Sequence, residues 1–423
     1  MAPLRRSALV HESAGAISTA LMPILFLIVF IDLVGFGLVI PLLPYYAQRF
    51  AASPLQMTLL FAIYSLMSMM TAPLWGRLSD RVGRRPVLMA SMAAAGLAYL
   101  GLAFATGLWM VFAARAFAGA CAGNIAAAQA YIADVTAPEQ RAKGMGMIGA
   151  AFGLGFIIGP VVGGILAGGD VATADLETPG LIAAVLSFSA FLGVIALLPE
   201  SLAAGGVRAS RGRITAARGA LGQPVLARLL VVFFLVILAF SGMETTFAWW
   251  AIGQFGWGPR PIGFVFFYVG LLSALMQGVL IGKLTARFGE ERLLLGGLGA
   301  IALGLLALPF AHDLTRLVIA LSALALGMGA MQPSLNSLIS RRAGVGEQGE
   351  VMGVAQSVGS LSRVLGPIIA GSLFAAFGRN SPYLWGAVLV GGALLVGWRL
   401  PRHQAPAATT MVPRPQPPLG PAE

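Results

Sequence analysis

Long apolar stretches, each near the ~20 residues that an α-helix needs to cross a bilayer, constrain this chain more than any other feature. Six of them lie near 20–43, 57–76, 86–105, 108–133, 145–168 and 180–199. After a polar gap, six more follow near 226–251, 261–282, 292–311, 314–340, 350–376 and 382–399. Because lipid offers no hydrogen-bond partners, the backbone of each stretch must satisfy itself as a helix. We therefore predict an all-α integral membrane protein with 12 transmembrane helices.

Composition and charge support a membrane protein and a fixed orientation. The chain is 58% hydrophobic and 10% charged, whereas a soluble domain carries about 25% charged residues. Its net charge is +11, and most of its 27 cationic residues fall in loops or tails on one side. The loops of the other side hold Arg49, Arg260, Arg316 and Arg379. The positive-inside rule then predicts a multi-pass protein with both termini cytoplasmic, and the excess charge does not indicate nucleic-acid binding. Because nearly all the cations are arginines and Ala and Gly are abundant, we expect a bacterial protein of the cytoplasmic (inner) membrane.

Residue types that carry catalysis are scarce. The single cysteine, Cys121, excludes a disulfide framework or a cysteine-based metal site. His11, His312 and His403 fall in the termini or a loop, and the sequence has no Gly-Lys-Ser/Thr phosphate loop and no nucleophile triad. We therefore expect neither an enzyme nor a bound cofactor or metal.

The two sets of six helices look like copies of one unit. Gly159-Pro160 in the fifth stretch returns as Gly366-Pro367 in the eleventh, and both pairs have further glycines at matching positions. We expect two pseudo-symmetric six-helix bundles around a central cavity. The predicted parts are an N-terminal tail, an N-terminal bundle, a cytoplasmic linker, a C-terminal bundle and a disordered cytoplasmic tail, at 1–19, 20–199, 200–225, 226–400 and 401–423.

A charged block between the second and third stretches carries a family resemblance. Residues 76–85 read Gly-Arg-Leu-Ser-Asp-Arg-Val-Gly-Arg-Arg, which resembles the loop motif of the major facilitator superfamily. The resemblance implies a cytoplasmic gating loop that uses Gly76, Asp80, Arg81, Gly83 and Arg84. It also implies an acidic partner at the end of helix four, where Asp134 fits. A solvated loop without a gating role is the alternative.

The degenerate second copy of this loop lies at 282–289, and Ala286 stands in it where the first copy has Asp80. We therefore expect the gating chemistry to lie in the first half.

Glycines in helix five resemble the motif of the superfamily's antiporters. They share the helix with a proline, and the set is Gly155, Gly159, Pro160, Gly163 and Gly164. Glycines at four-residue spacing allow a facing helix to approach closely, and the proline bends the helix. The resemblance implies export, although general helix packing would explain the same residues.

Four ionisable residues lie inside the apolar stretches. They are Asp32, Arg115, Glu244 and Arg363, and Arg115 begins an Arg-x-x-x-Gly sequence that resembles the family's helix-four motif. A charge within a span is costly, so each should face a partner or a wet cavity. We expect these residues to couple transport to protons, with at least one acid exchanging its arginine for a proton. Static pairs, Asp32 with Arg115 and Glu244 with Arg363, are the alternative.

Helical spacing places further polar residues on the cavity. Gln129 falls on the same face as Arg115 if helix four is continuous, and Asn124 falls on the opposite face, where it would bond a neighbouring helix. The expected substrate cavity also has Gln356 and Ser360 near Arg363, and an aromatic wall of Phe247, Trp249 and Trp250. Interfacial anchoring is the alternative for the two tryptophans.

The family resemblance covers roughly residues 20–400. Within it, the first half is most similar to tetracycline efflux proteins, notably at 131–134, Tyr-Ile-Ala-Asp, and 198–201, Leu-Pro-Glu-Ser. It lacks those proteins' acid in helix three and ionisable residues in helices eight and nine, so a tetracycline–metal chelate is not the expected substrate. The resemblance implies a monomeric antiporter that exports hydrophobic or cationic drugs or other small molecules, with protons as the second substrate and the proton gradient as its energy source. A transporter of an ordinary metabolite, or a non-transporting sensor, remains the alternative.

Overall fold

The computed structural model describes residues 2–136, 140–201, 219, 222–343 and 347–399, and every regular element in them is helical. It has 12 helices long and apolar enough to cross a membrane. Those of the first half are built from α1 (Ala2–Val39), η1 (Ile40–Leu42), α2 (Leu43–Arg49), α3 (Pro54–Val82), α4 (Arg84–Ala103), α5 (Leu108–Ala120), α6 (Asn124–Val135), α7 (Arg141–Ala167) and α8 (Glu177–Leu197). Those of the second half are built from α10 (Pro224–Phe255), α11 (Pro259–Leu275), η3 (Met276–Leu280), α12 (Ile281–Phe288), α13 (Glu290–Ala307), η4 (Leu308–Phe310), α14 (Leu314–Arg342), α15 (Gln348–Phe377) and α16 (Ser381–Trp398).

These helices confirm the predicted fold class and all twelve predicted stretches. The first stretch is longer than predicted, because α1 already begins at Ala2 and includes what was expected to be a tail. Nearly all of the predicted linker and the whole predicted C-terminal tail, 401–423, lie outside the described residues. The boundaries of the parts therefore stay predictions.

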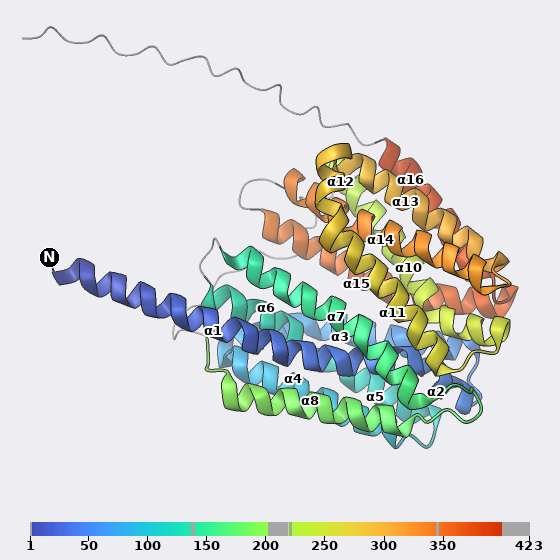
Figure 1. Cartoon of the computed structure of the whole chain (residues 1–423), viewed down its shortest axis with the longest axis horizontal. Helices are drawn as coiled ribbons and strands as arrows, with labels where there is room; N and C mark the ends of the chain where they lie inside the picture. Colours follow the sequence, from blue (N-terminus) through green and yellow to red (C-terminus); the bar gives the residue numbers. More distant parts are fainter. Residues whose placement is uncertain (1, 137–139, 202–218, 220–221, 344–346, 400–423) are drawn as a thin grey trace, which may run out of the picture.

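The two halves repeat one packing scheme, and Figure 1 shows them as separate groups of helices, α1 to α8 and α10 to α16. In the first half α7 packs on α1, where a Cβ placed on Gly159 would lie 2.7 Å from the carbonyl carbon of Gly37. In the second half α15 packs on α10 in the same way, and a Cβ on Gly366 would lie 2.7 Å from the carbonyl oxygen of Leu238. The absence of side chains at these positions lets the backbones touch.

The halves meet at one end of the molecule, which we call the Gly168 end. There the backbone N–H of Arg260 donates to the carbonyl of Gly168 at 2.9 Å, and the Tyr45 hydroxyl donates to the carbonyl of Trp257 at 3.1 Å. Two glycines bring backbones of opposite halves together: Gly164 lies against α11 and Gly371 against the start of α3. In Figure 1 the two halves converge at this end, near α2.

At the opposite end, the Gly83 end, the same helices are apart. A Cβ on Gly149 or Gly153 of α7, or on Gly353 of α15, would meet nothing within 4 Å. The side chains of Met70 and Leu74 on α3 are 62% and 61% exposed. Since these segments belong to the helices that touch the other half at the Gly168 end, the molecule is closed at the Gly168 end and open at the Gly83 end.

The fourth span is broken, which the sequence interpretation did not anticipate. Helix α5 ends at Ala120 and α6 begins at Asn124. The break is held by two side chains: the Trp75 indole N–H donates to the carbonyl of Ala120 at 2.7 Å, and the Ser91 hydroxyl accepts from the N–H of Gly123 at 3.2 Å. The predicted alignment of Arg115 with Gln129 assumed a continuous helix, which the structure does not have.

Candidate functional site

Asp32, near the middle of the first span, is held by hydrogen bonds to other helices. The Asn124 amide donates to Oδ2 at 2.5 Å, and the Ser187 hydroxyl donates to Oδ1 at 2.9 Å. The aspartate is only 3% exposed. Both of its oxygens therefore join α1 to α6 and α8, and the helix break directs Asn124 towards it. Asn124 does bond a neighbouring helix as expected, but Ser187 was missed, because a serine in a span gives no sign of its partner.

Arg115 does not pair with Asp32, so the static pair considered from the sequence is wrong. Its guanidinium carbon lies 4.4 Å from the centre of the Tyr64 ring, and Nε donates to the carbonyl of Leu60 at 3.3 Å. The side chain is 2% exposed, so the cation is stabilised by a π-face and a backbone dipole inside the protein. Tyr64 was not singled out from the sequence, where it is one aromatic residue among many in a span.

Glu244 on α10 and Arg363 on α15 are not in direct contact. Their charges interact, but among the described residues neither side chain has an ion-pair partner within 4.0 Å or a hydrogen bond. Arg363 is exposed and Glu244 is partly exposed. The static pair Glu244–Arg363 is therefore not formed either, and these two charges are accessible where Asp32 and Arg115 are not.

The other predicted cavity residues divide into two groups. Gln129 and Gln356 are exposed, and Ser360 is partly exposed and donates to the carbonyl of Gln356 at 3.0 Å. These three positions are compatible with an open cavity.

The predicted aromatic wall is wrong in this structure. Phe247 and Trp250 are 3% and 0% exposed and belong to a hydrophobic core cluster with residues of both halves, and Trp249 packs against the same cluster. The Trp250 indole N–H donates to the side-chain oxygen of Asn380 at 2.9 Å. Spacing along α10 could not show which face of the helix its neighbours would cover.

The glycines of the antiporter-like motif serve two contacts. Gly155, Gly159 and Gly163 lie on one face of α7 and pack on the backbone between Leu33 and Leu38 of α1. Gly164 points away from α1 and packs on Pro259 and Gly263 of α11, in the other half. Pro160 lies inside the same helix. The predicted close approach is present, and one of its contacts joins the halves at the Gly168 end.

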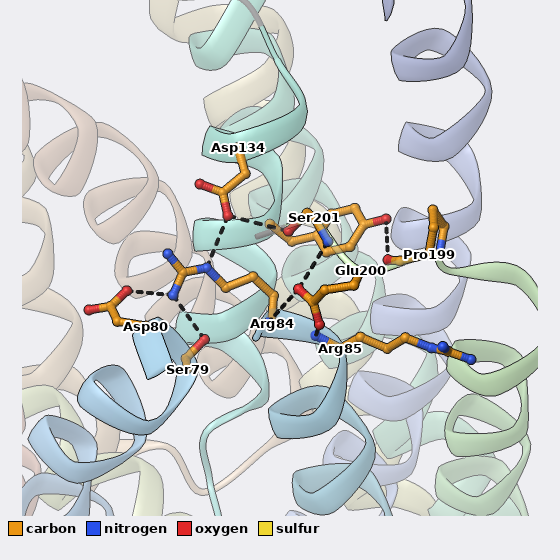
Figure 2. A network of polar contacts seen from close by, with 9 residues as sticks. Ser79, Asp80, Arg84, Arg85, Asp134, Pro199, Glu200 and Ser201 are labelled. Atoms are coloured by element: carbon orange, nitrogen blue, oxygen red, sulfur yellow. Dashed lines mark hydrogen bonds and ion pairs between the residues drawn. The ribbon is translucent and has the colours of Figure 1, made fainter. Parts of the chain in front are cut away.

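At the Gly83 end, the charged loop centres on Arg84, as Figure 2 shows. Its guanidinium contacts Asp80 at 2.5 Å, Asp134 at 3.0 Å and the Ser79 hydroxyl at 3.2 Å. The chain turns at Gly83, whose φ of +106° favours glycine. The structure thus brings together the predicted residues Asp80, Arg84 and Asp134.

Two predicted loop residues lie apart from this cluster. Arg81 is exposed and has no ion-pair partner among the described residues. A Cβ placed on Gly76 would meet nothing within 4 Å. Their assignment to gating stays a prediction.

Glu200 completes the cluster and was not predicted as part of it. Its carboxylate accepts the backbone N–H groups of Arg84 at 2.8 Å and Arg85 at 3.2 Å, at the start of α4 (Figure 2). A carboxylate stabilises a helix N-terminus, where N–H groups lack partners and the dipole is positive. The sequence showed Glu200 only within a stretch that resembles relatives, because the contact joins segments far apart in the chain.

The second half has a matching contact with its charges reversed. The loop turns at Gly289, whose φ is +79°, and the next residue is Glu290 where the first half has Arg84. Glu290 contacts Arg341 at the end of α14 at 3.1 Å, as Arg84 contacts Asp134 at the end of α6. The Ser337 hydroxyl also donates to Glu290 at 2.8 Å. The second loop therefore keeps an ion pair although it lacks the counterpart of Asp80.

Comparison with known proteins agrees with this architecture. The chain is 36% identical to the tetracycline resistance protein, class C, of Escherichia coli over 86% of this chain and 91% of that protein. Its structure resembles that of the human organic anion transporter MFSD10, with a TM-score of 0.67, 24% identity, and coverage of 90% of this chain and 99% of that one.

A bacterial homologue of the lysosomal transporter Spinster, solved in an inward-facing and occupied conformation, gives a TM-score of 0.72 at 14% identity, covering 90% of this chain and 96% of that one. The family model described as Major Facilitator Superfamily matches residues 25–367 and 262–420. With twelve spans in two matching halves that close at one end, the chain belongs to the major facilitator superfamily and is a multi-pass membrane transporter.

Proposed function

We propose that this transporter is a proton-coupled antiporter that exports hydrophobic or cationic small molecules from the cytoplasm by alternating access. Relatives named as tetracycline resistance proteins support export of a drug-like compound. The glycine-rich face of α7, which resembles the antiporter motif, supports exchange. Monomeric function, without a cofactor and with the proton gradient as energy source, is part of the same proposal.

The cationic loops orient the molecule. The Gly83 end carries Arg77, Arg81, Arg84 and Arg85, so the positive-inside rule makes it the cytoplasmic side. Both termini then lie in the cytoplasm, and the bacterial relatives favour the inner membrane. In this orientation the structure faces inward, open to the cytoplasm and closed to the outside.

The observation that carries the proposal is Glu244, a partly exposed carboxylate inside a span with no ion pair or hydrogen bond among the described residues. An ionised carboxylate at this depth is costly, so binding of either a proton or a substrate cation is favoured. Because one carboxylate holds one of them at a time, the two ligands compete. Competition for a site that is accessible from each side in turn is sufficient for exchange.

Asp32 has a different part in this scheme. Its two hydrogen bonds already stabilise its charge, and its burial separates it from the open end. We infer that it positions α6 and α8 against α1, whereas Glu244 is the acid that exchanges. The positive charge of Arg363 attracts the ionised carboxylate of Glu244.

The test is drug accumulation in an efflux-deficient bacterial host, with and without a protonophore. We expect the wild-type protein to lower accumulation of a hydrophobic cation and the protonophore to abolish that effect. Lower accumulation that persists with the protonophore would contradict proton coupling. Unchanged accumulation across a broad panel would instead favour transport of an ordinary metabolite or a sensor.

A further inference from the structure

The eighth span, built from α11, η3 and α12, contains a π-turn that its counterpart in the first half lacks. Helix α3 is a continuous α-helix, whereas α11 passes through the π-turn η3 before it continues as α12. Gly76 lies 22 residues after Pro54, but Gly282 lies 23 residues after Pro259. The second half therefore has one extra residue in this span, which the wider i→i+5 turn accommodates. Because helices kink at such turns, η3 is a place where the eighth span can hinge.

Up to the π-turn, the eighth span is fixed to its own half. The Ser273 hydroxyl donates to the carbonyl of Ala325 on α14 at 3.2 Å. A Cβ placed on Gly329 of α14 would lie 2.8 Å from the Cβ of Met276, the first residue of η3. Met276 is buried, whereas the next four residues, 277–280, are all exposed. The span is thus anchored before the π-turn and free directly after it.

Beside this free segment the second half has an apolar groove of about 220 Å³. Its lining includes Met276 of η3, Gly296, Gly297 and Ala300 of α13, and Ala330 of α14. Gly296 is exposed, and a Cβ placed on it would meet nothing within 4 Å. The free segment continues as α12, which lies beside α13 (Figure 1). The small residues of α13 and α14 therefore leave room for a side chain next to the segment.

In the first half the corresponding place is filled by Trp75. Its indole N–H donates to the carbonyl of Ala120 at 2.7 Å. A Cβ placed on Gly123 would lie 2.9 Å from the Trp75 ring and 2.9 Å from the Ser91 hydroxyl oxygen, so the ring packs where α4 meets the fourth span. Ser91 lies eight residues after the turn glycine of its loop, as Gly297 does in the second half. The groove at Gly297 is therefore the equivalent of the place that Trp75 fills.

Ile281 is the counterpart of Trp75 in the second half. Each residue directly precedes the first glycine of its loop, Gly282 or Gly76. Ile281 is partly exposed and is not among the residues that line the groove. The first half thus has this position docked on its own helices, whereas the second half has it undocked beside an open groove.

The free segment follows the face through which the eighth span meets the first half. A Cβ placed on Gly270 of α11 would lie 2.8 Å from the Ile157 side chain of α7. Gly153 and Gly146 continue the same face of α7 towards the Gly83 end, and a Cβ on either would meet nothing within 4 Å. Gly278 lies about two turns after Gly270 in the same direction. When the Gly83 end closes, α7 therefore approaches the free segment from the side opposite the groove.

We propose that residues 277–288 form a hinged arm that docks in the groove when the Gly83 end closes. The π-turn η3 is the hinge, and contact with α7 moves the arm towards α13 and α14. Ile281 then takes the place that Trp75 already has in the first half. The structure, which is open at the Gly83 end, has the arm undocked. This inference rests on the alternating access of the proposed function, but not on which substrate or ion is carried.

A side chain placed in the groove separates docking from folding. Gly296→Leu fits the structure as it stands, because a Cβ at Gly296 meets nothing within 4 Å, but its side chain occupies the groove that the arm needs. Gly299→Leu is the matched control: it makes the same change on α13, a Cβ there also meets nothing within 4 Å, and Gly299 does not line the groove.

The measurement is electron spin resonance on the purified full chain, in a Cys121→Ser background. Labels on Val279 and Leu303, which are 56% and 66% exposed, give the arm distance. Leu303 lies on α13 about two turns beyond Gly296, so docking of the arm shortens this distance. Labels on Thr173 and Arg316 give the outer distance, which lengthens when the Gly168 end opens.

Gly164→Val supplies the second conformation, because a side chain at Gly164 would collide with the Pro259 carbonyl and so disfavours closure of the Gly168 end. In this variant we expect the outer distance to lengthen and the arm distance to shorten together. Adding Gly296→Leu should lower the population with a short arm distance and a long outer distance roughly 5- to 150-fold. Adding Gly299→Leu should leave that population unchanged.

Two results would overturn the proposal. A longer outer distance with an unchanged arm distance would show that the span does not hinge at η3. Equal populations after Gly296→Leu and Gly299→Leu would show that the arm does not enter the groove. Both distances are measured without substrate or gradient, so a protein that moves in this way but does not export would contradict the proposed function and not the hinged arm.

Discussion

The two halves share a backbone plan and differ in the chemistry built on it. Glycines let α7 pack on α1 and α15 pack on α10 through equivalent contacts. On this common frame, Phe156 of the first half stands three residues before a Gly-Pro pair, where the second half has Arg363. The loops differ as well: Arg84 contacts Asp134 in one half, and Glu290 contacts Arg341 with reversed charge in the other. Backbone contacts are thus symmetric between the halves, whereas charges are not. Substitutions of equivalent packing glycines should therefore have similar effects in both halves, and substitutions of charged residues should have different effects.

The largest difference between the halves is expected for their membrane-embedded acids, Asp32 and Glu244. Glu244→Gln should reduce proton-driven uptake into inside-out vesicles to the level of vesicles without the protein, because the amide binds no proton. Exchange of labelled for unlabelled substrate without a gradient should persist. Asp32→Asn should retain measurable proton-driven uptake, since Asp32 is assigned a positioning role. Equal loss of proton-driven uptake in both variants would contradict the proposed division of roles between Asp32 and Glu244.

Backbone contact at the Gly168 end should show symmetry. A side chain at Gly164 would collide with the Pro259 carbonyl, and one at Gly371 would collide with Thr58. Overpacking costs about 1–3 kcal/mol, so Gly164→Val and Gly371→Val should each shift the conformational population roughly 5- to 150-fold away from closure of this end.

The shift is measured by electron spin resonance distances between labels on Thr173 and Arg316, in a Cys121→Ser background. Gly146→Val is the control, because a Cβ there meets nothing within 4 Å. A shift in only one of the two glycine variants would contradict equivalent closure by both halves.

The charge-reversed loops should contribute unequally to stability. Arg84 has a side chain only 10% exposed and contacts two carboxylates, whereas Arg341 is 68% exposed beside Glu290. Arg84→Ala should therefore lower the free energy of unfolding by about 1–3 kcal/mol, and Arg341→Ala by less than about 1 kcal/mol. Thermal unfolding in detergent measures both. The same loss in each variant would mean that burial does not distinguish the two ion pairs.

A small effect is expected at the helix starts of the Gly168 end. Asp175 accepts the N–H groups of Glu177 and Thr178, both at 3.0 Å, and the Thr178 hydroxyl is the main cause that lowers the pKa of Asp175 below its usual value. The pKa of Asp175 is therefore lower in the folded protein than in the unfolded chain. Its contribution to stability is complete above the ordinary carboxyl pKa and is lost as the pH falls through the pKa of the folded protein.

Asp175→Ala should therefore lower stability by roughly 1 kcal/mol at neutral pH, and the difference should vanish in acid. Asp313→Ala, which removes the equivalent cap of α14, is the matched variant in the second half. A difference between Asp175→Ala and wild type that grows as the pH falls would contradict a lowered pKa of Asp175 in the folded protein.

How far the sequence could predict this molecule depends on the range of the interactions involved. Apolar length alone located all twelve spans, and the spacing of Gly155, Gly159 and Gly163 indicated a helix face for close packing. The cluster of Asp80, Arg84 and Asp134 was predicted through resemblance. Asp80 and Arg84 stand in the motif at 76–85, and Asp134 ends helix four, where similar transporters have an acid.

The errors have a common physical origin. The break before Asn124 depends on Trp75 and Ser91, side chains from two other helices, so no local pattern revealed it. For the same reason the pairing of Asp32 with Arg115 was wrong: Asn124 and Ser187 reach Asp32 instead. Phe247 packs on Phe266 of α11 and Trp250 packs on Tyr383 of α16, and a helical wheel of α10 does not contain these neighbours. Contacts between helices decide these features, and periodicity within one helix does not record them.

Proton release on substrate binding tests the central claim, that Glu244 is the carboxylate for which proton and substrate compete. Purified protein in weakly buffered detergent solution is mixed with the hydrophobic cation 1-pyrenemethylammonium while the signal of a pH indicator is recorded. The pH is set near the value at which the wild-type protein holds about one exchangeable proton. We expect substrate binding to release protons from the wild type and from Asp32→Asn, and none from Glu244→Gln. Release that persists in Glu244→Gln and disappears in Asp32→Asn would contradict the account.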